Sequence, residues 1–258
     1  MTRPARDNEA GAQSLTGQAM DDPILTIEER AAINNGRWFS SLSPSLRHDI
    51  LRCAYVKRYK DGDLITARGD PSTDWVACAR GAVRVSSTSI TGKQITLTYV
   101  EPGIWFGDVA IFDGDRRTHD AYAHGDTTLV CVATADFRKI LTAHVELYEA
   151  LLRLHSRRIR QLFGLVEDLN TLPLRARLAK QLAHLARSYG VPQLANGSEL
   201  RIGLHLAQEE LAQLLGASRQ RVNQELKAME REEVIRIEPG GLVVRNRDAL
   251  MRIVEADS

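Results

Sequence analysis

The pattern of apolar and polar positions divides the chain into a β-rich part and a helical part. From about Trp38 to Ala133, short runs rich in β-branched residues alternate with glycine-containing turns, and the clearest runs are GAVRVSST, KQITLTYV and DTTLVCVATA. Regularly spaced short strands with such turns predict a closed roll or sandwich. We therefore expect residues 36–135 to form a double-stranded β-helix, or jelly-roll, which we call the β-roll.

The helical part begins with a long apolar stripe whose members alternate spacings of four and three residues. The stripe comprises Tyr148, Leu152, His155, Ile159, Leu162, Val166 and Leu169. This heptad pattern favours a helix that pairs with a second copy of itself, and a helix buried against its own domain is the alternative. Four arginines on the same segment are expected to face solvent: Arg153, Arg157, Arg158 and Arg160.

Proline and capping residues indicate where the segments begin and end. Pro173 follows the stripe, and proline suits the first turn of a helix but not its interior. We therefore predict a long dimerisation helix and hinge over residues 136–172 and a separate domain over 173–258. At the other end, Thr26 and Glu29 have capping-box spacing, which predicts a short helix closing a flexible tail of residues 1–35. The expected fold class is α+β.

Residues 207–230, AQEELAQLLGASRQRVNQELKAME, predict two helices joined by a tight turn. Gly216 permits the turn, and Ser218 can cap the second helix. The apolar faces of the two helices comprise Leu211, Leu214, Leu215, Val222, Leu226 and Met229. The opposite face of the second helix carries Arg219, Gln220, Asn223, Gln224 and Lys227. This is the pattern of a helix-turn-helix whose second helix enters the major groove of double-stranded DNA.

The outward side chains have the chemistry that base edges and phosphates require. Arginine can donate two hydrogen bonds to guanine, and asparagine or glutamine can pair with adenine. Ser218 and nearby basic side chains suit phosphate oxygens, which position a protein without reading sequence. Further on, residues 234–246, VIRIEPGGLVVRN, predict two short strands about a Pro-Gly-Gly turn, the wing of a winged helix.

Composition excludes several other classes of protein. No apolar run reaches the ~18 residues of a membrane span, and the N-terminus lacks a secretory core, so we expect a cytoplasmic protein. The three cysteines lie far apart, which predicts reduced thiols and neither a disulfide framework nor an iron–sulfur site. The seven histidines form no H-x-H pair, and no nucleophile–base arrangement stands out. We therefore predict neither a metal site nor an enzyme, although some jelly-roll proteins are metalloenzymes.

From the cassette GDVAIFDGDRRT (Gly107–Thr118) and from GASRQRVNQELKAME (Gly216–Glu230), the chain resembles the Crp/Fnr family of bacterial transcription regulators. The resemblance covers about Trp38 to the C-terminus and implies a cyclic-nucleotide-binding β-roll, a dimerising helix and a winged helix. It also implies ligand-binding roles within the cassette: Asp108 accepts a ribose hydroxyl, Arg117 and Thr118 face the phosphate, and Gly107 lets the protein backbone approach the ligand.

Departures from the family pattern affect the ligand that we expect. Asp108 is one carbon shorter than the family's glutamate, and Asp120 would repel a phosphate unless it points away. The adenine-reading positions of the cyclic-AMP receptors fall on Leu162 and Phe163, which offer no hydrogen bonds. An unpaired buried polar edge costs ~1–3 kcal/mol, so we expect cyclic AMP to be a poor effector. The two alternatives are another nucleotide, for example a cyclic dinucleotide matched by the arginine-rich helix, and a pocket that has lost ligand binding.

The resemblance also bears on DNA and protein partners. Where the family presents arginine, glutamate and arginine to the bases, this chain has Arg219, Gln220 and Gln224, which predicts a palindromic operator related to but distinct from the family's site. The family commonly touches RNA polymerase, and residues 192–198 lie near one such contact. A nucleotide-binding regulatory subunit that acts on a partner protein is the competing class.

Overall fold

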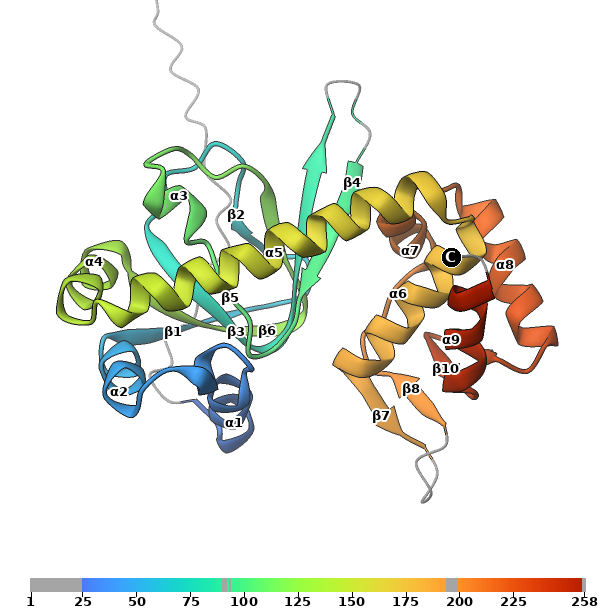
Figure 1. Cartoon of the computed structure of the whole chain (residues 1–258), viewed down its shortest axis with the longest axis horizontal. Helices are drawn as coiled ribbons and strands as arrows, with labels where there is room; N and C mark the ends of the chain where they lie inside the picture. Colours follow the sequence, from blue (N-terminus) through green and yellow to red (C-terminus); the bar gives the residue numbers. More distant parts are fainter. Residues whose placement is uncertain (1–24, 90–91, 93, 194–198, 257–258) are drawn as a thin grey trace, which may run out of the picture.

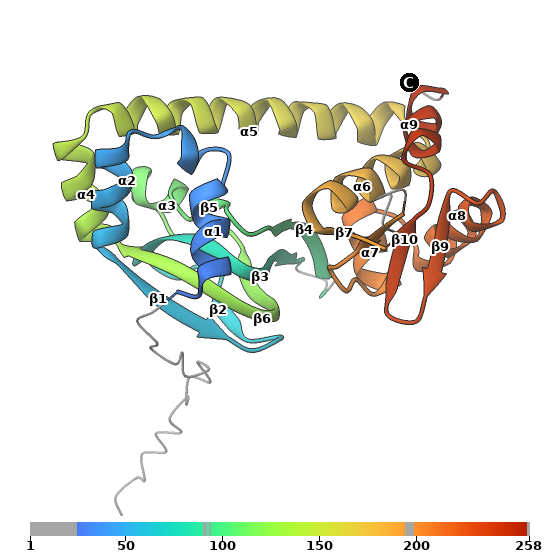
Figure 2. The same cartoon turned by 90° about the horizontal axis from the view of Figure 1, so that it is seen from below.

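Two domains are joined by one long helix in the computed structural model, which describes residues 25–89, 92, 94–193 and 199–256 (Figures 1 and 2). The long helix, α5 (Glu146–Thr171), runs from the β-roll to the C-terminal domain. The predicted α+β class is confirmed. The predicted tail lies outside the described residues, except for its final part from Leu25 onwards.

The β-roll is an antiparallel structure of six strands. They are β1 (Ala54–Tyr59), β2 (Leu64–Thr66), β3 (Asp74–Thr88), β4 (Gln94–Val100), β5 (Trp105–Phe106) and β6 (Asp120–Ala133). Their order is β1-β6-β3-β4, with β2 paired to β6 and β5 paired to β3. The long strands β3 and β6 pair from Asp74↔Ala133 to Ser86↔Asp120 and form the centre of the sheet. The β-roll predicted from the spacing of the strands is therefore present.

Short helices cover the roll. They are α1 (Ile27–Asn35), a 3₁₀ turn (Phe39–Ser41), α2 (Pro44–Arg52), α3 (Val109–Phe112) and α4 (Thr134–Ala143). The capping box predicted at the start of α1 is confirmed, because the amide of Glu29 donates to the Thr26 hydroxyl at 3.2 Å and the amide of Thr26 donates to the Glu29 carboxylate at 2.9 Å.

The helices pack on the roll through aromatic side chains. The ring centroids of Trp75 and Trp105 lie 4.2 Å apart, and Phe39 stacks on Trp105 at 5.4 Å. A second apolar layer inside the roll contains Cys78 and Cys131, which are free thiols, as expected from their spacing. Burial raises the pKa of each thiol to about 12, so neither is reactive at neutral pH.

The segment predicted as one long helix over 136–172 contains two helices. Helix α4 ends at Ala143, and α5 begins at Glu146 after a break at His144 and Val145. The apolar stripe begins only at Tyr148, after the break, so the hydrophobic pattern could not predict where α4 ends and α5 begins. The start of α5 is fixed to the N-terminal helices, because the indole of Trp38 donates to the carbonyl oxygen of Ala150 at 3.0 Å.

The C-terminal domain is a winged helix with more strands than its sequence predicted. Its elements are α6 (Leu174–Tyr189), β7 (Gly190–Pro192), β8 (Leu200–Ile202), α7 (Gln208–Leu215), α8 (Arg219–Arg231), β9 (Ile235–Glu238), β10 (Gly241–Val244) and α9 (Arg247–Ala256). The predicted wing is formed by β9 and β10. The sequence predicted only the two strands of the wing and missed β7 and β8, because strands of three residues are too short to show an alternation of apolar and polar positions.

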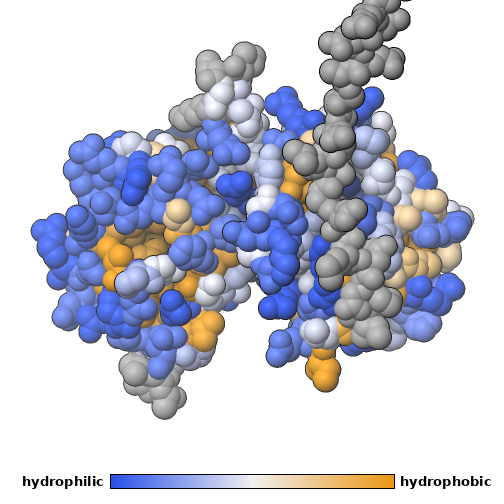
Figure 3. Space-filling view, turned by 180° about the vertical axis from the view of Figure 1, so that it is seen from behind, coloured by the Kyte–Doolittle hydropathy of each residue, from blue (hydrophilic) through white to orange (hydrophobic). Residues whose placement is uncertain are grey.

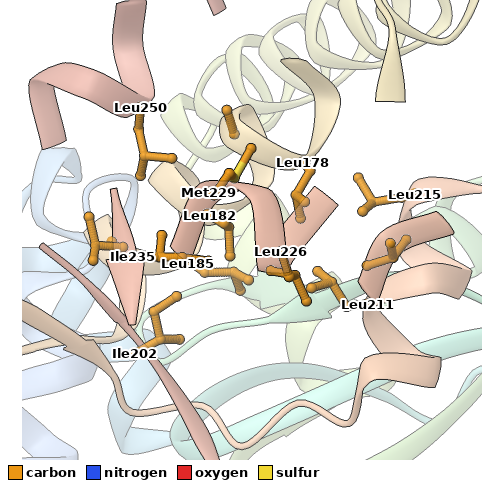
Figure 4. Close-up of a cluster of buried hydrophobic side chains, with 14 of the residues drawn as sticks. Leu178, Leu182, Leu185, Ile202, Leu211, Leu215, Leu226, Met229, Ile235 and Leu250 are labelled. Carbon is orange, nitrogen blue, oxygen red and sulfur yellow. The ribbon is translucent and has the colours of Figure 1, made fainter. Parts of the chain in front are cut away.

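Leucines from α6, α7 and α8 fill the core of this domain (Figure 4). Leu178 and Leu182 of α6 face Leu211 and Leu215 of α7 and Leu226 of α8 in one cluster. None of the described helices is both long and apolar enough to cross a membrane. The face opposite to that of Figure 1 is largely hydrophilic, and its broadest apolar area lies over the C-terminal domain (Figure 3).

Candidate functional site

The turn between α7 and α8 is built as its sequence predicts. Gly216 adopts the left-handed conformation with φ 60°, and the amide of Ala217 donates to the carbonyl oxygen of Ala212 at 3.0 Å, which closes α7. The hydroxyl of Ser218 then accepts a hydrogen bond from the amide of Arg221 at 3.4 Å and caps α8. The two helices are therefore held in a fixed relation by the turn and by their shared core.

Helix α8 buries one face and exposes the other. Val222, Leu226 and Met229 are buried. The exposed side chains that the sequence predicted to meet DNA are Ser218, Arg219, Gln220, Gln224 and Lys227. Asn223 differs from them, because it is half-buried and its amide oxygen lies 3.5 Å from Nε2 of Gln208 on α7. Arg221, which the sequence reading did not select, is also exposed.

The cassette forms a loop and the short helix α3. Gly107 precedes α3 with φ 87°, a conformation that favours glycine, and a Cβ atom there would lie 2.6 Å from Nη1 of Arg117. Arg117 donates to the carbonyl oxygens of Gly107 at 3.2 Å and of Asp74 at 2.7 Å. Burial lowers the pKa of Arg117. Its half-buried guanidinium thus donates to neutral backbone carbonyls, and the nearby carboxylates of Asp74, Asp108 and Asp70 favour its charged form.

The side chain of Asp108 points away from that of Arg117 and towards α5. It is 1% exposed, and its Oδ2 lies 2.9 Å from Nε2 of His155 and its Oδ1 lies 3.4 Å from Nη1 of Arg158. Arg158 also donates to the carbonyl oxygen of Trp105. Burial alone raises the pKa of Asp108, but contact with His155 and the charge of Arg158 outweigh it, so the pKa lies below its ordinary value. Asp108 is therefore an ionised acid that joins the cassette to α5.

The remaining polar residues of the cassette point to solvent or to neighbouring loops. The hydroxyl of Thr118 is exposed and lies 2.8 Å from Nδ1 of His119. Asp120 accepts a hydrogen bond from the amide of Arg68 at 2.8 Å, so the acid that would have repelled a phosphate is directed at the backbone of another loop.

A cavity of about 60 Å³ lies inside the roll beside Arg117. Lys57, Tyr59 and Asp74 line it together with Arg117, and Lys57 pairs with Asp74 at 3.3 Å. Burial raises the pKa of Tyr59 to about 12, so the hydroxyl is a neutral donor at neutral pH. Typical small-molecule sites enclose about 300–1,000 Å³, so this cavity must widen to admit a nucleotide. Sequence reasoning missed Lys57, Tyr59 and Asp74, because they come from β1 and β3 and only the strand register unites them.

The apolar stripe on α5 is exposed except at His155. Its exposed members are Tyr148, Leu152, Ile159, Leu162, Val166 and Leu169, and Phe163 and Leu165 extend it. Leu162 is 60% exposed and Phe163 70% exposed. His155 was predicted to belong to the pairing face, but it faces its own roll, in contact with Asp108 and edge-on to Phe112. The heptad assignment therefore needs correcting at this position. Arg158, expected to face solvent, is half-buried for the same reason.

Within the described part of the chain, no group of three or more histidine, cysteine or acidic side chains could hold a metal ion. The histidines have other neighbours: His144 contacts Asp49 at 2.8 Å and His124 contacts the backbone of His205 at 2.6 Å.

Comparison with known proteins matches both domains. Residues 56–144 match the cyclic nucleotide-binding domain, and residues 176–253 match the Crp-like helix-turn-helix domain. The chain is 29% identical over 214 residues to the CRP-like cAMP-activated global transcriptional regulator of Mycobacterium tuberculosis, which covers 83% of this chain and 94% of that protein. It is 30% identical over 205 residues to the cyclic AMP receptor protein of Thermus thermophilus, or 79% of this chain and 90% of that protein. The structure of FixK2 from Bradyrhizobium japonicum shares the fold, with a TM-score of 0.67 and 20% identity over 78% of this chain and 96% of that one.

Proposed function

This chain belongs to the Crp/Fnr family of bacterial transcription regulators, and we propose that it acts as a cytoplasmic homodimer that reads a palindromic operator with α8 and binds an anionic nucleotide at the roll. The exposed polar face of α8 is the observation that carries this proposal. Arg219, Gln220 and Gln224 stand clear of the core that fixes the helix, so they are free to meet base edges.

The residues of α8 take different roles. Arg219 donates to a guanine edge, and Gln220 and Gln224 select other bases, with adenine the pairing that an amide favours. Ser218 and Lys227 contact phosphates and set the register. Asn223 contributes less to base reading than its residue type suggests, because Gln208 already contacts its amide oxygen.

Pairing along α5 supplies the second α8. The exposed stripe of leucine, isoleucine and valine is the surface that a second copy would bury, and a twofold dimer places two recognition helices about 34 Å apart, one turn of DNA. The dimer would act on transcription through RNA polymerase, as the family commonly does. The loop named for that contact, residues 192–198, falls outside the described residues from 194 onwards.

For the ligand, Arg117 supplies the charge that a phosphodiester needs, and Thr118 a hydroxyl beside it. A nucleotide that uses Asp108 as its ribose acceptor must take this carboxylate from His155 and Arg158. Although two relatives are named for cyclic AMP, Leu162 and Phe163 offer an adenine no hydrogen bond. We propose a cyclic nucleotide or dinucleotide effector other than cyclic AMP.

A constitutive regulator with a closed pocket is the second candidate, and a specific observation favours it. The cavity encloses only about 60 Å³, Arg117 is bonded to backbone carbonyls and Asp108 is bound to α5. In such a regulator the roll would act only as a structural base for the dimer.

Two measurements on the full-length protein test these proposals. Selection from random duplexes is expected to yield a palindrome whose half-sites lie one helical turn apart, and failure to enrich any duplex would refute operator reading. Calorimetric titration with cyclic AMP, cyclic GMP and cyclic di-GMP then separates the candidates. We expect heat from a ligand other than cyclic AMP, with loss of that heat in Arg117→Ala. No heat from any of the three favours the constitutive regulator.

A further inference from the structure

Helix α7 of the C-terminal domain lies against strand β4 of the roll. The hydroxyl of Thr96 on β4 donates to Oε1 of Gln213 on α7 at 2.8 Å, and Thr96 is only 3% exposed. A threonine in an edge strand normally faces water, so its burial here against a side chain of another domain marks a formed interface and not a chance approach.

Charged residues continue this interface from the adjacent strands. Nη1 of Arg84 on β3 lies 3.6 Å from Oε1 of Glu210 on α7, and both side chains are less than a quarter exposed. Arg84 is held in place by Tyr122, whose ring centroid lies 5.2 Å from its guanidinium carbon. Glu210 in turn accepts a hydrogen bond from the amide of Ala207 at 2.9 Å, so the same carboxylate caps α7 and pairs with the roll.

Two histidines connect the roll to the wing. Nε2 of His124 on β6 lies 2.6 Å from the carbonyl oxygen of His205, and a carbonyl only accepts, so Nε2 carries the proton. Nδ1 of His124 lies 3.8 Å from Glu210. The ring of His205 contacts the carbonyl oxygen of Gly240, in the turn of the wing, at 2.6 Å. The roll thereby contacts both α7 and the segment that supports the wing.

Apolar burial adds to these polar contacts. Tyr99 and Ala82 belong to the roll by sequence, but they are buried in the same cluster as Leu211, Ala212 and Leu215. Burial raises the pKa of Tyr99, and the charge of Glu210 adds to the effect. The core of the C-terminal domain therefore includes side chains of the β-roll.

The interface and the predicted DNA-reading surface use different faces. The roll contacts α7, whereas α8 lies at the end of the C-terminal domain that is farther from the roll (Figures 1 and 2). On α8, Arg219, Gln220 and Gln224 are exposed. The two lobes meet in the middle of the opposite face of the molecule (Figure 3). The contact with the roll therefore leaves the α8 side chains that are predicted to read DNA uncovered.

We propose that Arg84, Thr96 and His124 of the roll and His205, Glu210 and Gln213 of the C-terminal domain form an interdomain clasp that holds α8 in the orientation needed for a palindromic operator. This inference rests on the proposed function. A dimer binds both half-sites only when its two recognition helices have the right spacing and direction, and a domain that is free to rotate loses affinity to the ordering that binding then requires. The clasp removes that freedom before DNA arrives. It acts by positioning and contacts no base.

Matched substitutions test the clasp on full-length protein with the selected operator and with a duplex that holds one half-site. Glu210→Gln and Thr96→Val are expected to weaken binding to the palindrome by about tenfold and to leave half-site binding unchanged, because one domain can still reorient freely. The controls are Glu209→Gln and Thr98→Val, which make the same chemical changes at exposed neighbouring positions. Equal weakening on both duplexes indicates damage to the helix-turn-helix and overturns the clasp, as does an unchanged palindrome affinity.

A disulfide gives an independent measurement. Thr96→Cys combined with Gln213→Cys is expected to cross-link on oxidation, and the oxidised protein is expected to bind the palindrome at least as tightly as the reduced protein. Each single cysteine variant controls for the natural thiols. If oxidation abolishes operator binding, the contact must open for DNA and the proposal is overturned. Failure of the wild-type protein to bind any duplex refutes the proposed function, whereas the yield of the cross-link reports on the interface regardless of DNA.

Discussion

The carboxylate of Asp108 lies 2.9 Å from Nε2 of His155, so one buried acid ties the cassette to the helix predicted to pair two protomers. The same carboxylate also lies 3.4 Å from Arg158. A ligand that binds the Asp108 carboxylate must displace His155 and Arg158 from it. Because coupling between two sites is reciprocal, a change in the position of α5 must also change the affinity of the cassette for that ligand.

Asp108→Asn is expected to lower the free energy of unfolding of the roll by ~1–3 kcal/mol at pH 7, because the half-buried guanidinium of Arg158 loses its counter-charge and His155 loses a carboxylate partner. The folded pKa of Asp108 lies below its unfolded value of about 3.9, so the stabilisation is present above about pH 4 and is lost as pH falls through the folded pKa. Urea titration followed by tryptophan fluorescence measures it, since Trp38, Trp75 and Trp105 all lie in the N-terminal domain. Asp113→Asn, at an exposed position of the cassette, is the control; an equal loss in both variants would argue against the ion pair.

Glu29→Gln should make the roll less stable at neutral pH. Glu29 is buried and accepts from Arg58 and Thr128 at 2.7 Å each. Burial alone raises its pKa, but these bonds outweigh burial and lower the pKa to about 2. The stabilisation is thus present above about pH 4.5 and disappears as pH falls towards 2, with an upper limit of about 3 kcal/mol at pH 7. The same urea titration between pH 3 and pH 7 is the measurement. Glu28→Gln, one residue away and exposed, should change nothing, and a flat pH profile of the difference would count against the assignment.

Gly107→Ala is expected to displace Arg117 and to weaken the binding of an anionic ligand. An alanine there needs φ near 87°, which costs ~1–2 kcal/mol, and its Cβ would lie 2.6 Å from Nη1 of Arg117. Gly114→Ala is a close control, because Gly114 also has a positive φ, 73°, but nothing within 4 Å of the added atom. We expect both variants to lose similar stability and only Gly107→Ala to lose ligand affinity in calorimetry. Equal ligand affinity in the two variants would show that Arg117 does not contribute to ligand binding.

Arg219→Ala and Lys227→Ala should weaken DNA binding in different ways. Arg219→Ala is expected to cost ~1–3 kcal/mol on the selected operator and to relax the preference at one base pair of each half-site. Lys227→Ala is expected to weaken binding to all sequences alike and to lower the slope of log affinity against log salt by about one for each phosphate that is no longer neutralised. Fluorescence anisotropy over a series of salt concentrations measures both. A preserved base preference in Arg219→Ala would show that another residue reads that position.

Leu162→Glu is expected to convert the dimer to monomer. Leu162 lies in the middle of the exposed stripe of α5, and a charge placed in the seam of two paired helices is left without water or a partner. Analytical ultracentrifugation measures the change in mass. Gln161→Glu adds the same charge at the exposed neighbouring position and should leave the dimer intact. Dissociation of both variants would indicate a general charge effect, and dissociation of neither would place the dimer contact elsewhere.

Local patterns in the sequence were sufficient wherever a structure depends on neighbouring residues. The capping box of Thr26 and Glu29, the left-handed Gly216, the cap at Ser218 and the apolar face of α8 each follow from residues within one or two helical turns. The strands of the roll are equally legible, because alternation and glycine turns are local properties. For this reason the fold class and the helix-turn-helix could be predicted without coordinates.

Tertiary packing decided which partners these elements meet. The heptad pattern gives His155 a place on the pairing stripe, but an acid on a loop 47 residues earlier in the chain draws it to the roll. Lys57 and Asp74 join Arg117 around a cavity only through strand register, and Thr96 meets Gln213 only because one domain folds back on the other. Periodicity shows which face of a helix or strand is apolar. Which faces pack against each other depends on the arrangement of all the elements, and no short stretch of sequence encodes it.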